Sequence, residues 1–303
     1  MTTPRRRNDR RRGLARRRLV AGVVVVAALA ALGWGAARLA ADVRDHDGGK
    51  AQPSSSATGH RRLPTLRILF PEGFTRRQMA ERIAAVNVIA RQKRHVRTRL
   101  SPARYIHIAS TSSFPRDFPG AGGTRSLEGF LFPALYEFSP VTSTRALVDD
   151  QLAAFRDNWR KVDLAYARSK NLTPYDVLII ASMIEKEVRA PRERRLVAAV
   201  IYNRLHRRMQ LGIDATIRYA LNVPPTQSLT SSDLRNPTPY NTRIHTGLPP
   251  TPISNPGLAS IRAAAHPARV DYLYFVRKPD KVHHFFTASY RAFRAYEKAH
   301  GYG

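Results

Sequence analysis

Two glutamates stand at the end of a segment that is otherwise almost wholly apolar. The segment Pro174–Val188 reads PYDVLIIASMIEKEV, and this pattern predicts a helix that is central to its domain. At 100° per residue, Glu187 falls between Ile180 and Met183, among bulky apolar side chains. Glu185 falls on a neighbouring part of the circumference, beside smaller residues. The sequence therefore predicts at least one glutamate in an apolar setting.

Such a glutamate could serve as a general acid. Burial disfavours the charged form of a carboxyl group and raises its pKa. Cleavage of a glycosidic bond needs a carboxylic acid that is still protonated near neutral pH. The alternative is that Glu185 or Glu187 forms ion pairs with the arginines that follow, and spacing alone leaves both roles open. Those arginines are Arg189, Arg192, Arg194 and Arg195.

Two further polar residues lie in apolar surroundings. Glu128 stands in the aromatic stretch Ser126–Pro133 (SLEGFLFP), which would suit the wall of a sugar site, although core packing explains it equally well. Asn203 lies on the apolar face of a helix predicted over 192–208. A buried amide needs a partner, and we expect a carboxyl group on the neighbouring helix.

The last candidates lie in the irregular C-terminal part of the chain. Asp214 opens a short predicted helix, where capping the helix is its commoner role. Tyr240 and Asn241 belong to a proline-rich and polar stretch, typical of a loop that shapes a groove. His266 precedes a proline near the end of this region. We expect these four residues, together with Glu128 and Asn203, to bind substrate. No histidine spacing predicts a metal site, and we expect no cofactor.

The N-terminal region predicts a membrane anchor. Nine arginines lie within residues 1–18, and residues 19–37 are uncharged and almost wholly apolar, close to the length that crosses a bilayer. The positive-inside rule then predicts a single-pass type II protein of the cell membrane, with its bulk outside the cell. A cleaved signal peptide is the alternative. We expect a basic tail at 1–18, a transmembrane helix at 19–41 and a flexible linker at 42–63.

Charge and cysteine content agree with this organisation. The net charge of +29 predicts attraction to polyanions, and the chain has no cysteine, so disulfides and thiolate sites are excluded. Nucleic acid is not expected as a partner, because the arginines cluster before the apolar span and no recognition motif accompanies them.

Two folded parts are expected after the linker. A strand over 65–70, a turn and a helix over 76–85 capped by Thr75 predict a small αβ module at 64–123. The motif-rich remainder predicts a larger catalytic domain at 124–303. The fold class is therefore α+β.

The motifs together resemble one family. Their order and spacing are similar to those of the endolytic murein transglycosylases, the MltG or YceG-like family. The resemblance rests on SLEGFLFP, ASMIEKEV, YNRL, TPYNT, GLPPTPISNPG, AAAHPA and YLYFV. It implies a lytic cleavage of the β-1,4 bond between N-acetylmuramic acid and N-acetylglucosamine in peptidoglycan strands, in which one glutamate is first acid and then base. It also implies that the small module is LysM-like and that peptidoglycan synthases are candidate partners.

The resemblance leaves two registers for the catalytic glutamate. Lytic transglycosylases often carry it just before a serine or threonine, which selects Glu187, although Val188 follows here. Counting back from Asn203 selects Glu185. We favour Glu187 because larger apolar residues surround it. Hydrolysis at the same site and a non-catalytic scaffold that binds peptidoglycan remain the competing functions.

Overall fold

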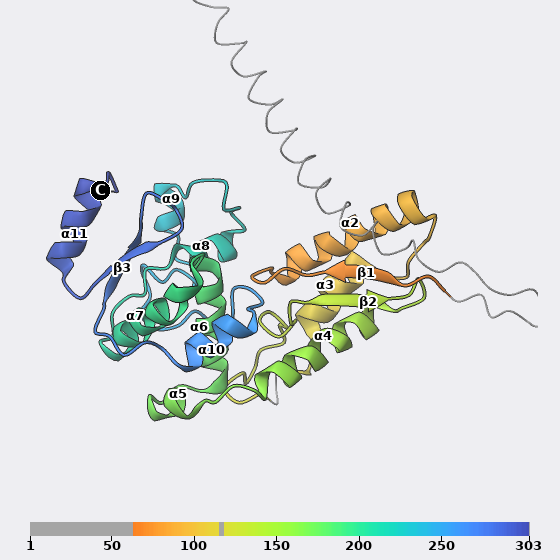
Figure 1. The fold of residues 1–303 in the computed structure, drawn as a ribbon, viewed down its shortest axis with the longest axis horizontal. Coiled ribbons are helices and arrows are strands. Elements are labelled where there is room, and N and C mark those ends of the chain that lie inside the picture. Colours follow the sequence, from red (N-terminus) through yellow and green to blue (C-terminus); the bar gives the residue numbers. More distant parts are fainter. Residues whose placement is uncertain (1–62, 115–117, 303) are drawn as a thin grey trace, which may run out of the picture. The chain divides into compact units, whose positions relative to one another are not determined.

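The computed structural model describes residues 63–114 and 118–302, which form a mixed α and β structure (Figure 1). The predicted basic tail, transmembrane helix and nearly all of the predicted linker lie outside these residues. Within the described part of the chain, no helix combines the length and apolar character needed to cross a bilayer. The elements in chain order are β1 (Leu66–Leu69), α2 (Arg76–Arg94), α3 (Pro102–Thr111), β2 (Leu135–Phe138), α4 (Thr144–Trp159), α5 (Ala165–Ser169), α6 (Pro174–Glu187), the 3-10 helix η2 (Pro191–Glu193), α7 (Arg194–His206), α8 (Asp214–Leu221), α9 (Ser231–Leu234), α10 (Leu258–Ala265), β3 (Tyr274–Arg277), β4 (His284–Thr287) and α11 (Tyr290–Ala299).

Strands β1 and β2 pair antiparallel, with Leu66 opposite Phe138 and Leu69 opposite Leu135. The alternation of the sequence gives β1 one buried face, formed by Leu66 and Ile68. The predicted strand is thus confirmed. Because β2 lies after residue 124, the sheet joins segments on both sides of the predicted boundary. The domain limits and the likeness to a LysM module stay predictions.

Helix α2 begins where the sequence predicted and ends later. The Thr75 side chain accepts a hydrogen bond from the Gln78 N–H, and the Gln78 side chain accepts one from the Thr75 N–H. This capping box satisfies two N–H groups at the helix start. The helix passes the predicted end at residue 85 and stops at His95, whose φ of 53° is left-handed. Val88 and Ile89, which point to solvent, obscured the helical pattern in the sequence.

Helix α6 is central to the C-terminal part, as predicted, and packs against α7 and α10 (Figure 1). Thr173 caps it through a second capping box with Asp176. Its apolar side chains are fully buried on nearly all sides, since Val177, Leu178, Ile180, Met183 and Ile184 have no exposed surface. The last turn of this buried helix carries Glu185 and Glu187.

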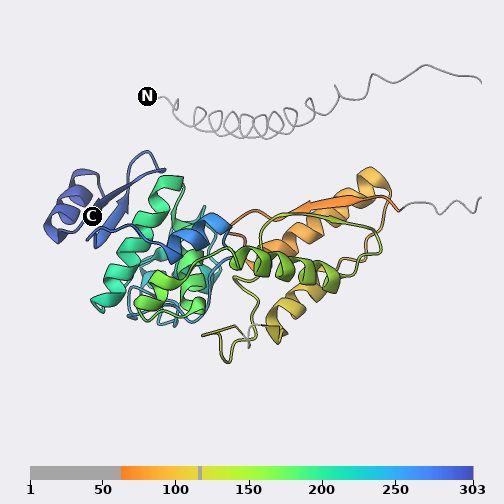
Figure 2. The same ribbon diagram turned by 60° about the horizontal axis from the view of Figure 1, so that its bottom comes forward.

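A β-hairpin and a terminal helix complete the chain (Figure 2). Strands β3 and β4 pair antiparallel, with Arg277 opposite His284. Helix α11 packs against both strands through aromatic rings, including Phe285 and Tyr296, whose centroids are 4.3 Å apart. The hairpin also contacts α7, and its Arg277 thereby reaches the end of α6.

Candidate active site

Glu187 lies at the end of α6 beside the hairpin and the start of α8. Only 15% of its side-chain surface is exposed, and its Oε2 is 3.9 Å from Nη2 of Arg277. The same Nη2 donates to the Glu187 carbonyl oxygen at 3.5 Å. A residue of β3, ninety positions further along the chain, therefore neighbours this carboxylate.

Burial raises the pKa of Glu187 above its ordinary value. The Arg277 guanidinium opposes this rise, Asp214 adds to it, and the backbone N–H of Ala215 and the side chain of Arg218 also oppose it. Three of these four groups belong to α8, whose first residue is Asp214. The α8 N-terminus and Arg277 therefore surround a carboxyl group that stays protonated to higher pH than an exposed glutamate.

Glu185 has a different environment, although it is only two residues away. Its Oε2 accepts a hydrogen bond of 3.0 Å from the N–H of Gly257, which is the N-cap residue of α10. A carboxylate at this place satisfies a free N–H group and complements the helix dipole. Glu72 lies close by, and burial together with the charge of Glu185 raises its pKa. The position of Glu185 fits a helix-capping role.

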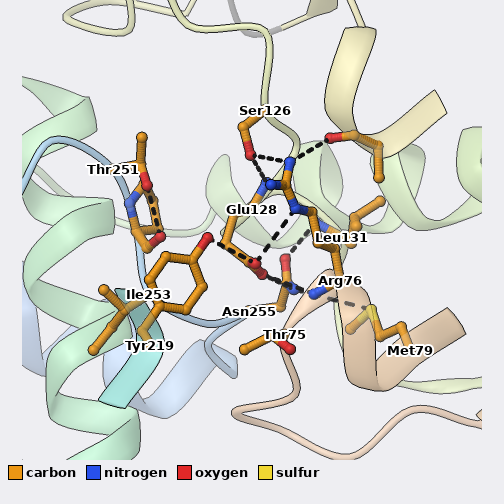
Figure 3. Close-up of polar contacts among 12 residues, drawn as sticks. Thr75, Arg76, Met79, Ser126, Glu128, Leu131, Tyr219, Thr251, Ile253 and Asn255 are labelled. Carbon is orange, nitrogen blue, oxygen red and sulfur yellow. Dashed lines mark hydrogen bonds and ion pairs between the residues drawn. The ribbon is translucent and has the colours of Figure 1, made fainter. Parts of the chain in front are cut away.

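Glu128 is enclosed by the protein, with 1% of its surface exposed. Its Oε1 accepts hydrogen bonds from the Arg76 N–H at 3.0 Å and from Asn255 Nδ2 at 2.8 Å, and its Oε2 accepts one from the Tyr219 hydroxyl at 3.2 Å (Figure 3). Burial raises the pKa of Glu128 to about 7, against the opposing effect of these partners. Its polar contacts are thus made within the protein, and it links α2, α8 and the loop before α10.

Asn255 is a structural residue that the sequence analysis did not single out. It has no exposed surface, and its Oδ1 accepts from the N–H groups of both Gly129 and Leu131. Its Nδ2 also donates to the carbonyl of Phe74. One amide thus ties the turn at 129–131 to the turn before α2. The only signal in the sequence was its place in the motif GLPPTPISNPG.

The two predicted asparagines bond to backbone carbonyls. Asn203 Nδ2 donates to Val270 and Tyr272 at 2.9 Å each, so the expected carboxyl partner is wrong. The amide instead holds the segment that leads into β3. Asn203 also lines an open surface hollow of about 740 Å³ together with Tyr166 and Tyr202. Asn241 is fully buried and donates to the carbonyls of Leu234, at the end of α9, and of Asn236 in the loop that follows.

The three remaining predicted residues occupy different places. Asp214 is the first residue of α8 and forms an ion pair of 2.6 Å with Arg243. Ile213 is the N-cap residue, so the alternative of a capping role for Asp214 is wrong. Tyr240 packs its ring 5.4 Å from that of Tyr219, the partner of Glu128.

His266 is the C-cap residue of α10, and its exposed ring nitrogen Nε2 lies 4.0 Å from the Asp163 carboxylate. No contact of the structure joins it to Glu187. Of the predicted substrate-binding residues, Asp214 is the one whose charge affects the pKa of Glu187.

A buried pair fixes the hairpin that carries Arg277. Glu193 accepts hydrogen bonds from the His284 backbone N–H at 3.1 Å and pairs with His284 Nδ1 at 2.6 Å. The His284 side chain is 1% exposed. Since Glu193 follows Glu187 by six residues and His284 lies opposite Arg277, the pair joins the end of α6 to the strand beside it.

Among the described residues, no group of three or more histidine, aspartate or glutamate side chains is arranged to hold a metal ion. The chemistry that these positions can provide is proton transfer by Glu187. Arg277 and the start of α8 set the charge around that group.

Comparison with known proteins points to one family. A model of the YceG-like family matches residues 51–299. The endolytic murein transglycosylase of Streptococcus pneumoniae R6 is 34% identical over 230 residues, which are 71% of this chain and 40% of that protein. The enzyme of the same name from Bacillus subtilis 168 is 37% identical over 153 residues, 50% of this chain and 42% of that protein.

A solved structure agrees with these matches. The crystal structure of a YceG-like protein from Listeria monocytogenes superposes with a TM-score of 0.63 at 28% identity, covering 76% of this chain and 75% of that one. The chain spans 40% to 42% of the length of the curated relatives above.

Proposed function

Because the chain belongs to the YceG-like family, we propose that it is a membrane-anchored endolytic transglycosylase of peptidoglycan with Glu187 as its catalytic residue. The substrate would be a nascent glycan strand. The bond cleaved would be the β-1,4 bond from N-acetylmuramic acid to N-acetylglucosamine. Two relatives named endolytic murein transglycosylase support the reaction class.

The environment of Glu187 is the observation that carries this proposal. The carboxyl group is mostly buried, and burial raises its pKa, which suits a general acid near neutral pH. Glu185, the competing candidate, already accepts the hydrogen bond of Gly257 at the start of α10.

The reaction needs one carboxyl group in two successive roles. Protonated Glu187 gives its proton to the glycosidic oxygen, and the bond from that oxygen to C1 of the muramyl residue breaks with its electron pair going to the oxygen. The carboxylate then accepts the proton of the muramyl 6-hydroxyl, whose oxygen bonds to C1. The products are a free N-acetylglucosamine hydroxyl and a 1,6-anhydro ring, and Glu187 is protonated again. No water is consumed, so a second carboxylate is not required, unlike in most glycosidases.

The groups around Glu187 would assist at both steps. The charge of Arg277 stabilises the carboxylate formed after the first proton transfer. Asp214 lies at the start of α8 near the same carboxylate and is exposed enough to meet a sugar, as is Tyr240. These two are the residues that we propose to contact substrate, whereas Glu128, Asn203 and Asn241 stabilise the surrounding fold through the contacts described above.

The test is mass spectrometry of the products from uncrosslinked glycan strands incubated with the purified full chain in detergent. We expect 1,6-anhydro-muramyl ends from the unchanged protein and from Glu185→Gln, and none from Glu187→Gln. Reducing ends would make the protein a hydrolase. Absence of cleavage by the folded, unchanged chain would favour a scaffold that binds peptidoglycan, and loss of cleavage in Glu185→Gln alone would move the catalytic role to Glu185.

A further inference from the structure

The C-terminal half of α2 is apolar on the side that faces solvent. Its buried side contributes Met79, Ile83 and Ala90 to the core. On the opposite side Val88 and Ile89 are 52% and 56% exposed, and exposed Ala84 and Ala85 precede them by one turn. A helix on a protein surface normally presents polar residues there. This exposed stripe, residues 84, 85, 88 and 89, is therefore available for an apolar partner.

A group of cations follows the exposed stripe. They continue from the last turn of α2 into the segment that follows it, and all are exposed. None of them forms an ion pair with another described residue. The one carboxylate of α2, Glu81, lies one turn before Ala84 and Ala85, at the opposite end of the stripe from these cations. These cations are Arg91, Lys93, Arg94, Arg97 and Arg99.

The stripe also lies where the chain enters this folded unit. Thr65, Leu66 and Arg67 share a hollow of about 370 Å³ with Ile89 and Arg94, and Figure 1 shows the start of β1 near the end of α2. The predicted linker at 42–63 would join this point to the predicted transmembrane helix. A flexible linker of that length has a root-mean-square span of roughly 25 Å, which keeps the stripe within reach of the bilayer.

We propose that the exposed stripe and the cations that follow it form a docking surface for an anionic phospholipid bilayer. Aliphatic side chains flanked by arginine and lysine are the features of helices that lie in a membrane interface, where the apolar side enters the boundary of the acyl chains. A soluble polyanion would be attracted by the cations but would gain nothing from Val88 and Ile89. The apolar stripe therefore favours the bilayer over the polyanion.

The proposed membrane anchor would allow even a docking surface of low affinity to bind the bilayer. Four exposed aliphatic residues, two of them alanines, and five cations give limited affinity, but a linked domain meets the membrane at a high effective concentration. Docking would orient α2 along the membrane plane. This proposal rests on the membrane anchor proposed above and is independent of the glycan chemistry of Glu187.

The absence of cysteine from the chain permits a single-label test. The full chain carrying Ile89→Cys is labelled with an environment-sensitive fluorophore and reconstituted with vesicles of phosphatidylglycerol and phosphatidylcholine, or of phosphatidylcholine alone, each containing brominated acyl chains as quencher. Ser232→Cys, on the exposed surface of α9, is the matched control. Flotation of the vesicles on a density gradient reports the anchor separately.

We expect quenching of the label at residue 89, but not at 232, and only with phosphatidylglycerol. Each cation is worth about 1 kcal/mol near an anionic surface, so each of Arg91→Gln, Lys93→Gln and Arg94→Gln should lower the ratio of docked to undocked molecules about fivefold. Cleavage of glycan strands in detergent should be unaffected, because none of these residues contacts Glu187.

Three results would overturn the proposal. A label at 89 that stays unquenched in protein that floats with the vesicles would remove the docking surface and leave the anchor. A chain that does not float even with excess anionic vesicles would remove both. The same change in fluorescence on adding soluble polyphosphate without vesicles would identify a polyanion as the partner.

Discussion

Glu185 and Glu187 lie two residues apart on α6, yet they contact different elements. Glu185 accepts a hydrogen bond from Gly257 at the start of α10, and Glu187 lies 3.9 Å from Arg277 of β3. On a helix, positions i and i+2 point about 200° apart, so the two carboxyl groups cannot share one environment. This separation is the basis for assigning capping to one and proton transfer to the other.

Glu185→Ala should reduce stability and spare the reaction. The change removes the acceptor at the α10 N-terminus, and loss of a cap costs about 1 kcal/mol. Urea unfolding should therefore show a lower free energy of unfolding, while the yield of anhydro ends per folded molecule stays near that of the unchanged protein. Asp149→Ala is a suitable comparison, since Asp149 forms an exposed ion pair within α4. An inactive but fully stable Glu185→Ala protein would contradict the assignment.

Arg277→Gln should shift the pH dependence of cleavage. The guanidinium lowers the pKa of Glu187 against the larger effect of burial, so its removal raises that pKa further. The acid form then persists to higher pH, and the alkaline limb of kcat/KM should move upward in pH. Arg277→Lys keeps the charge and should move it less. Arg145→Gln, which removes an exposed ion pair within α4, should leave the alkaline limb of kcat/KM unchanged. An alkaline limb that does not move in Arg277→Gln would argue against Glu187 as the acid.

Glu128→Gln should remove a pH dependence of stability. Burial raises the folded-state pKa of Glu128 from 4.5 to about 7, so the folded state binds more protons than the unfolded state between these values. The contribution of protonated Glu128 to the free energy of unfolding is therefore fully present below pH 4.5 and is lost as the pH rises through about 7. The rise in pKa corresponds to about 3 kcal/mol.

Chemical denaturation at pH 5 and pH 8 measures this effect. The unchanged protein should lose more stability than Glu128→Gln on going to pH 8. Glu137→Gln, which alters an exposed pair with Arg67, should behave like the unchanged protein. Equal pH profiles of the unchanged protein and Glu128→Gln would refute the prediction.

Glu193→Ala should destabilise the hairpin and weaken catalysis together. His284 would lose the acceptor of its backbone N–H and of its ring, and a buried group left without a partner costs about 1–3 kcal/mol. The free energy of unfolding should fall accordingly, and kcat should fall because β3 positions Arg277. Asp280→Asn changes a comparable contact with His283 on the exposed surface and should have a smaller effect. Full activity in Glu193→Ala would show that the pair does not position Arg277.

The local features of the fold were predictable because they depend on neighbouring residues. The cap at Thr75 and the apolar circumference of α6 are patterns within one or two helical turns, and each was confirmed. Similarly, the family could be inferred from motifs that keep their order along the chain, and the match to residues 51–299 confirmed it.

Contacts between distant segments could not be predicted in the same way. The partners of Asn203 are backbone carbonyls 67 and 69 residues away, and nothing in the sequence distinguishes them from a carboxylate on the next helix. The roles of Asn255 and of the pair formed by Glu193 and His284 also depend on such distant contacts.

The sequence by itself determined that a glutamate ends a buried helix, since the helical period and the apolar residues of α6 place it there. Only the tertiary structure decided what each glutamate does. The pKa and the partners of a carboxyl group depend on charges and N–H groups within a few ångströms, and for Glu187 and Glu185 these come from α8, β3 and α10, which lie 27 to 90 residues further along the chain.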